Sequence, residues 1–231
     1  MNSHSKITSA LRKIRPLLTN HKMKSFLTSL LILILNGFAV AQNKPEGIYT
    51  LRGIHDMAAS FNFTADGKFQ FQYYYGAVDR FASGTFMIEG DTLKLKSDKE
   101  AGKDFKVTKQ SKKGNGFTIV VNDKNPVLIN QVRCIFVKGD EAVFEDVTGN
   151  TGRLETGKID CDKIYLQHPF FPDIATLIKD EKNTNTFFEV TLNPSLQQVS
   201  FKGIDFLIKE NTLTCLPNYF MPFENIRFER E

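Results

Sequence analysis

Hydrophobic and polar residues alternate with a period of two along most of the chain after Pro45. The clearest run is FQFQYYY at residues 69–75, in which every second position is aromatic. Such alternation is typical of strands that bury one face, and the runs end at Gly, Asp or Asn, which favour turns. We therefore expect an all-β, antiparallel protein.

The length of a turn decides which residues of a hairpin lie opposite each other. Opposed residues share a face of the sheet, so they should both be apolar or both be polar. A three-residue loop at residues 65–67 opposes Phe63 to Phe69 and places Gly67 at the left-handed third position. A two-residue turn at residues 90–91 pairs Ile88 with Leu93. Both hairpins therefore have a defined register.

A third hairpin is expected to join residues 105–107 to residues 119–121 across a turn at 112–114. With an opening strand at residues 47–51, the pattern predicts about seven strands by residue 122. Each strand has one apolar face. Consecutive antiparallel strands can bury these faces by closing into a barrel or by folding into a sandwich.

The first part of the chain resembles the lipocalin-like domains of exported bacterial proteins. In that family a G-x-W motif near the first strand caps the barrel, and this chain has Tyr49 in place of the Trp. The resemblance covers residues 45–123 and implies a β-barrel that holds a small apolar ligand. It rests on Gly47-Ile48-Tyr49, Phe61-x-Phe63, Asp66-Gly67-x-Phe69, Ser83-Gly84-Thr85-Phe86 and Gly90-Asp91-Thr92-Leu93-x-Leu95.

A polar segment ending in Pro126 predicts a domain boundary. The strands expected after it, at 127–137, 142–147 and 158–167, resemble the transthyretin-like sandwich of carboxypeptidase regulatory-like domains. We expect a β-sandwich domain at 126–231, in which only residues 173–182 form a short helix. Its remaining strands are expected at 186–192, 198–201, 206–208, 212–215 and 225–228.

The first 41 residues contain six Lys and Arg and no Asp or Glu. From Met23 they follow the pattern of a secretory signal: Lys24, an apolar run at 26–35 and the small residues of Ala39-Val40-Ala41. The run is shorter than the roughly 20 residues needed to span a bilayer. We therefore expect residues 1–41 to be a leader with a signal peptide at 23–41, and the protein to be exported to the periplasm or the exterior with no stable membrane span.

Removal of the leader changes the net charge. Of 30 Lys and Arg, 24 remain against 26 Asp and Glu, so the exported part carries about −2. Without a basic stripe, nucleic acid is excluded as an expected partner. Cys134, Cys161 and Cys215 allow either one disulfide and a free thiol or three reduced cysteines, and they lack zinc spacing. We expect no metal and no cofactor.

Catalytic motifs are missing from the sequence, and only His55 and His168 remain after the leader. We therefore expect no catalytic residues and no enzyme activity, although a hydrolase using Asp56 and Asp79 is an alternative. His55 follows the opening strand, where it lines a barrel mouth or is simply an exposed loop residue.

Asp79 and Arg80 follow the break in alternation at Gly76. One interpretation is that Arg80, with Tyr73 or Tyr75, recognises an anionic group at the barrel mouth. The other is that the carboxylate and the guanidinium form an ion pair that fixes the turn. The ligand-binding candidates are Tyr73, Tyr75, Asp79, Arg80 and His55.

The many aromatic residues that share one face between Phe61 and Phe86 favour a non-enzymatic binding protein, with a small apolar or mixed ligand in an aromatic-lined barrel. The alternative is a structural or adaptor protein that docks another cell-envelope protein through the loops at Phe170-Phe171 and 217–222. A cavity of a few hundred Å³ inside the barrel favours the first.

Overall fold

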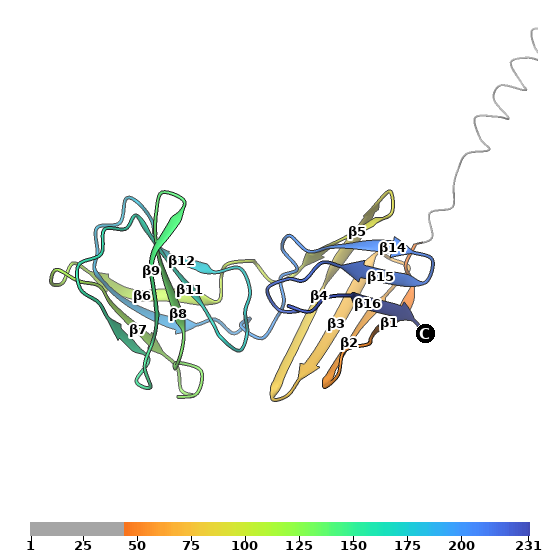
Figure 1. Ribbon diagram of the computed structural model, residues 1–231, viewed down its shortest axis with the longest axis horizontal. Helices are drawn as coiled ribbons and strands as arrows, with labels where there is room; N and C mark the ends of the chain where they lie inside the picture. The colour runs from red at the N-terminus through yellow and green to blue at the C-terminus, as the bar shows by residue number, and fades with distance from the viewer. Residues whose placement is uncertain (1–43) are drawn as a thin grey trace, which may run out of the picture. The chain divides into compact units, whose positions relative to one another are not determined.

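The computed structural model describes residues 44–231, which form sixteen strands and, within that range, no helix (Figure 1). These residues therefore contain no helix that is long and apolar enough to cross a membrane. The expected leader and signal peptide lie outside the described residues. The strands are β1 Gly47–Arg52, β2 Met57–Phe63, β3 Lys68–Tyr75, β4 Val78–Glu89, β5 Thr92–Ser97, β6 Phe105–Ser111, β7 Thr118–Asn122, β8 Arg133–Lys138, β9 Glu141–Val147, β10 Arg153–Glu155, β11 Lys163–Gln167, β12 Thr176–Lys179, β13 Phe187–Leu192, β14 Asp205–Lys209, β15 Thr212–Cys215 and β16 Ile226–Arg230.

Eight strands close into an antiparallel barrel in the order β1-β16-β15-β14-β5-β4-β3-β2. In Figure 1 the orange β1 therefore lies beside the dark blue β16, from the other end of the chain. The expected all-β class and the barrel are confirmed.

The expected hairpins of the barrel have the register derived from the sequence. Phe63 lies opposite Phe69 across the three-residue loop, in which Gly67 has a φ of 82°. Ile88 lies opposite Leu93 across the two-residue turn, in which Gly90 has a φ of 65°. In each turn glycine occupies the left-handed conformation that other residues adopt only with strain.

Aromatic rings fill the centre of the barrel. Phe61 is fully buried, and its ring centroid lies 4.6–6.3 Å from those of six other phenylalanines. These partners come from β2, β3, β14 and β16 and from the segment before β14: Phe63, Phe69, Phe71, Phe201, Phe206 and Phe228. The barrel around Phe61 is therefore packed with its own side chains.

The remaining strands form two four-stranded sheets, in the orders β10-β7-β13-β6 and β12-β11-β8-β9. Their inner faces share one apolar core, to which Ile119 and Phe188 contribute from the first sheet and Phe136 and Ile164 from the second. The two sheets therefore pack in the manner of a β-sandwich.

The assignment of strands to the two parts differs from the one expected. Strands β6 and β7 do not belong to the barrel, and strands β14–β16 do. The expected hairpin of β6 and β7 is wrong, because β13 lies between them and pairs parallel to β7. Alternation fixes the buried face of a strand but not its partner, so the sequence could not reveal that the sandwich strands interrupt the barrel.

Two expected elements are also corrected. The segment 173–182 contains strand β12, which pairs with β11, instead of a helix, because its apolar residues meet a sheet edge. The expected strand at 198–201 is reduced to an isolated bridge between Gln198 and Phe81.

Candidate functional site

A pocket of about 360 Å³ opens at the end of the barrel where the turn at Gly76 joins β3 to β4. We call it the mouth pocket. Three segments build its wall: the β3–β4 hairpin, the loop after β11 and the loop between β15 and β16. Its lining residues are Tyr73, Tyr75, Val78, Arg80, Pro169, Phe170, Pro172, Tyr219, Phe220, Pro222 and Phe223.

Aromatic rings dominate the mouth pocket. Tyr73 meets Phe220 edge to face, with ring centroids 5.8 Å apart, and Tyr75 meets Phe223 at 6.1 Å. Tyr75 remains 44% exposed and Phe170 46% exposed, so both rings present faces to an incoming molecule. The alternation of β3 explains this arrangement: it points Tyr73 and Tyr75 to the inner side, and the turn at Gly76 leaves Tyr75 at the rim.

Tyr73 adds a polar group to the aromatic wall. Its hydroxyl donates a weak hydrogen bond to the Phe220 carbonyl at 3.4 Å. Burial raises the pKa of Tyr73 above its ordinary value, and the nearby positive charge of Arg80 opposes this only in part. The Tyr73 hydroxyl therefore stays protonated at neutral pH.

Arg80 lies buried beneath the pocket. Its Nη1 donates to the Pro172 carbonyl at 2.7 Å, and its Nη2 donates to the Gln198 carbonyl at 3.0 Å. The guanidinium also lies 5.5 Å from the ring of Phe220, a cation–π distance. Arg80 thus joins β4 to two distant segments and holds the wall of the mouth pocket.

Arg80 belongs to a cluster of four buried charges. Lys99 Nζ lies 2.6 Å from Asp104 Oδ1 and 3.0 Å from Asp173 Oδ2, and Arg80 Nη2 lies 3.8 Å from the same Asp173 oxygen. We call these residues the buried charge cluster. Ser200 donates to Asp173 from its backbone nitrogen and from its hydroxyl.

The buried charge cluster contains two cations and two carboxylates, so its charges cancel. Burial lowers the pKa of Arg80, and the carboxylate of Asp173 opposes this shift. Burial raises the pKa of Asp104, and the ammonium of Lys99 opposes that shift. Burial removes water from all four groups and so disfavours their charged forms. The charged forms are stabilised by pairing with one another.

The structure places the five predicted site residues in two groups. Tyr73, Tyr75 and Arg80 line the mouth pocket together. Asp79 points to the opposite, exposed side of β4, and His55 is exposed in the turn before β2; neither lines the pocket.

The expected ion pair between Asp79 and Arg80 is wrong, because neighbouring residues of a strand face opposite sides. The carboxylate partner of Arg80 is Asp173. The sequence predicts the loops at Phe170-Phe171 and 217–222 as docking loops for a partner, and the structure shows that residues of both loops line this pocket. Their aromatic and proline residues were the available signal.

His168 fixes the position of Phe170 in the mouth pocket. Its Nε2 lies 3.0 Å from the Leu128 carbonyl, and its Nδ1 accepts a hydrogen bond from the Phe170 backbone at 3.2 Å. Burial lowers the pKa of His168 to about 4, so the ring is neutral at neutral pH. Only the neutral ring can accept at Nδ1, so the contact to Phe170 requires this protonation state.

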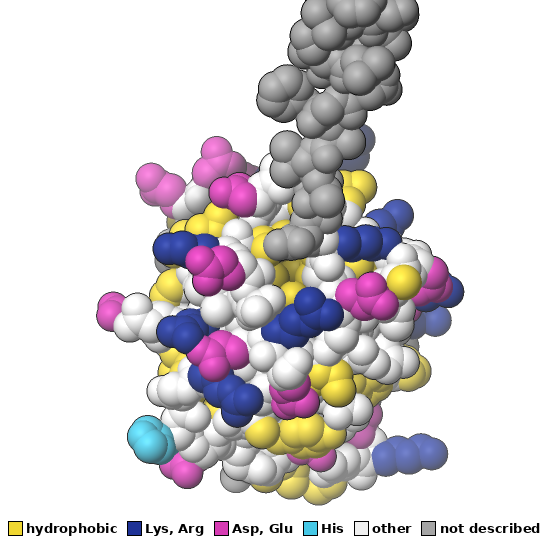
Figure 2. Space-filling view, turned by 90° about the vertical axis from the view of Figure 1, so that its right-hand side faces the viewer, with side chains coloured by type: hydrophobic (Ala, Val, Ile, Leu, Met, Phe, Trp, Pro, Cys, Tyr) yellow, Lys and Arg dark blue, Asp and Glu magenta, His cyan; other side chains and the backbone are white. Residues whose placement is uncertain are grey.

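Metal-ligand geometry, cysteine pairing and surface charge complete the description of residues 44–231. No group of three His, Cys, Asp or Glu side chains there is arranged to hold a metal ion, and the three cysteines are free. On the face seen in Figure 2, Lys and Arg side chains are interspersed with Asp and Glu, without a continuous basic stripe. Comparison of the chain with protein-family models, curated proteins and solved structures found no match.

Proposed function

We propose that the protein is an exported, non-enzymatic binding protein that holds a small apolar or mixed ligand in the mouth pocket. The observation that carries this proposal is the concentration of aromatic rings around a pocket of about 360 Å³. Ligand sites commonly have volumes of about 300–1,000 Å³ and apolar walls with a few polar groups. A cavity inside the barrel was the feature expected to favour ligand binding, and rings occupy the interior around Phe61 instead; the ligand site proposed is therefore at the end of the barrel.

The charge distribution favours a neutral ligand. Asp104 and Asp173 balance Arg80 and Lys99, and both terminal nitrogens of Arg80 already donate to backbone carbonyls. An anionic ligand would therefore gain little from the guanidinium. A flat, uncharged molecule would gain from contact with the rings of Tyr75, Phe170 and Phe223.

The walls of the mouth pocket are held in place before any ligand arrives. Arg80 holds Pro172, His168 holds Phe170, and Asn218 Oδ1 accepts from the backbone of Phe220 and Met221 at 3.3 and 3.0 Å. A preformed site loses less conformational entropy on binding. This geometry supports ligand binding by a largely rigid pocket.

The sequence resemblances fit this proposal. A closed eight-stranded antiparallel barrel is consistent with a lipocalin-like domain, and two packed four-stranded sheets are consistent with a transthyretin-like sandwich. We propose both as family relationships at the level of architecture.

Titration with a neutral, solvent-sensitive dye such as Nile red tests the proposal. Replacing Tyr75 by Ala removes one aromatic face of the pocket and is expected to weaken dye binding about three- to tenfold, since full burial of such a side chain contributes about 1.5–3 kcal/mol and a ligand can bury only the exposed 44% of Tyr75. Tyr74→Ala is the matched control, because Tyr74 is 46% exposed on the opposite face of the same strand. Equal binding by the two variants would contradict the proposal.

A second candidate function is docking of another cell-envelope protein. The observation in its favour is Leu216, which is 83% exposed at the start of the loop between β15 and β16. A photo-crosslinking residue at position 216 should then capture one defined partner in cells, and a residue placed at Asp79 should not. Capture of no partner at position 216 would remove this alternative.

A further inference from the structure

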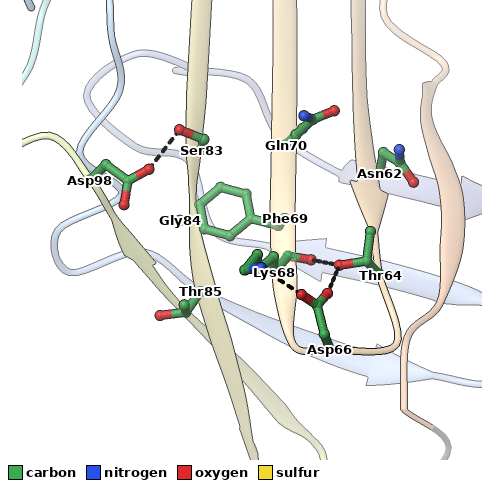
Figure 3. Close-up of a pocket in the computed structure, with 10 residues that line it drawn as sticks. All are labelled: Asn62, Thr64, Asp66, Lys68, Phe69, Gln70, Ser83, Gly84, Thr85 and Asp98. Carbon is green, nitrogen blue, oxygen red and sulfur yellow. Dashed lines mark hydrogen bonds and ion pairs between the residues drawn. The ribbon is translucent and has the colours of Figure 1, made fainter.

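A second hollow lies on the outer face of the barrel, across β2, β3 and β4, with a volume of about 550 Å³ (Figure 3). We call it the outer groove. Most of its lining side chains are polar, in contrast to those of the mouth pocket. They are Asn62, Thr64, Asp66, Lys68, Phe69, Gln70, Ser83, Gly84, Thr85 and Asp98.

Strand register arranges the polar groups of the outer groove in a row. Asn62 lies opposite Gln70 on the next strand, and Gln70 lies opposite Ser83 on the strand after that. Neighbouring strands are about 4.8 Å apart, so the row extends for about 10 Å. Asp98 ends the row, where it accepts a hydrogen bond from the Ser83 hydroxyl at 2.7 Å.

The middle of the outer groove holds unused hydrogen-bonding capacity. Within residues 44–231, the side chains of Asn62, Gln70 and Thr85 make no hydrogen bond, while those at the two ends do, as the dashed lines of Figure 3 show. Each amide offers two donor hydrogens and an acceptor oxygen, and the threonine hydroxyl offers both functions. The free groups are neutral and can both donate and accept.

The charges of the outer groove disfavour an anion. Asp66 is paired with Lys68 at 2.7 Å, and the hydrogen bond from Lys68 lowers the pKa of Asp66 to about 2. Asp98 is the remaining carboxylate, and it lacks an ion-pair partner within the described residues. The lining side chains therefore have a net charge of −1, and their one cation, Lys68, is already paired.

An aromatic ring flanks the outer groove. Phe81 precedes Ser83 by two residues on β4, so its side chain faces the same outer side about 7 Å along the strand. It is 46% exposed, although its size and apolar character favour burial. A ring in this position can cover a flat C–H surface next to the amides.

We propose that the outer groove is a binding site for a neutral saccharide, separate from the mouth pocket. Sugar hydroxyls donate and accept hydrogen bonds, as the free amides and hydroxyl of the groove do. Sugar rings also carry C–H faces that pack on aromatic rings such as Phe81, and they bear no charge for Asp98 to repel. The row from Asn62 to Ser83 is long enough to contact two sugar units.

The test is binding of the exported chain to a panel of neutral oligosaccharides of glucose, mannose, galactose, xylose and N-acetylglucosamine, measured by calorimetry at millimolar sugar. For the sugar that binds, the double variant Asn62→Ala/Gln70→Ala is expected to weaken affinity about 5- to 150-fold, because each of the two lost hydrogen bonds contributes about 0.5–1.5 kcal/mol. Phe81→Ser should weaken it as well. Gln110→Ala, which removes an exposed amide from β6, is the matched control and should leave affinity unchanged.

Two results would overturn the proposal: no member of the panel binds, or a sugar binds equally well to the double variant. The mouth pocket provides an independent reference. Tyr75→Ala should leave saccharide binding unchanged while it reduces dye binding, so the two sites can fail separately.

Discussion

Asp173 holds the buried charge cluster together, and its replacement by Asn is the most informative test of how the barrel and the sheets are joined. The carboxylate is fully buried, lies within 4 Å of two cations and accepts hydrogen bonds from Ser200 and from the Ile174 backbone. Asn has almost the same shape and keeps one acceptor oxygen, so the substitution removes charge with little change in packing.

After Asp173→Asn, Lys99 keeps its ion pair with Asp104, whereas Arg80 loses the ion pair that it makes with Asp173. Removing one partner of a buried ion pair costs about 3–5 kcal/mol, because the remaining charge is left desolvated without compensation. In a protein of 150–250 residues each kcal/mol lowers the melting temperature by about 2–4 °C. We therefore expect the melting temperature to fall by about 6–20 °C.

The assay is reversible urea denaturation followed by circular dichroism, with calorimetry for the melting temperature. Asp79→Asn is the matched control, because it removes an exposed carboxylate next to Arg80 and should change stability by no more than about 0.5 kcal/mol. In the double variant Asp173→Asn/Lys99→Met, the loss should be smaller than the sum of the single losses. A loss below about 1 kcal/mol for Asp173→Asn, or an equal loss for Asp79→Asn, would refute the reasoning.

Three further predictions concern pH, the barrel core and a tight strand contact. The pKa of His168 is about 4 in the folded state, below the unfolded value of about 6.5. The stability that the neutral ring contributes is therefore complete above pH 6.5 and is lost as the pH falls to 4. The free energy of unfolding of the wild type should drop by about 3 kcal/mol across that window, and that of His168→Gln should change less with pH. Phe61→Ala should cost about 3–5 kcal/mol in a denaturation experiment, and a cost below 1 would contradict the packing of six rings around Phe61. Gly84→Ala should destabilise by about 1–3 kcal/mol because its Cβ would lie 2.1 Å from the Lys96 carbonyl, while Gly157→Ala, which meets open space, should not destabilise by more than about 0.5 kcal/mol.

Local features of the barrel could be predicted from the sequence because they depend on neighbouring residues. Alternation gave the buried face of β3, and a glycine at a left-handed position gave the length of the β2–β3 loop. Together they determined the pairing of Phe63 with Phe69. The same reasoning placed Tyr73 and Tyr75 on the inner side, where they line the mouth pocket.

Long-range pairing was not predictable in this way. A period of two looks the same whichever strand lies alongside, so nothing in residues 226–230 indicates that β16 pairs with β1. The insertion of β13 between β6 and β7 was hidden for the same reason. The boundary expected at residue 126 therefore separated strands that belong to one sheet.

The environment of Arg80 shows the same limit at the level of the site. Sequence neighbours suggested Asp79 as its partner, but its contacts are to Pro172, Asp173 and Gln198, all more than 90 residues away. Distant loops supply these groups, and only the closed barrel brings them to β4. The sequence identified Arg80 as a candidate ligand-binding residue. In the folded protein its hydrogen bonds to Pro172 and Gln198 hold the wall of the mouth pocket in place.

The most direct test of the central claim is native mass spectrometry of the protein purified from its own host. We predict an added mass of a few hundred daltons, in keeping with a pocket of about 360 Å³, that is retained in Tyr74→Ala and lost in Tyr75→Ala. Wild-type protein that carries no bound mass, or an added mass that persists equally in Tyr75→Ala, would contradict ligand binding in the mouth pocket.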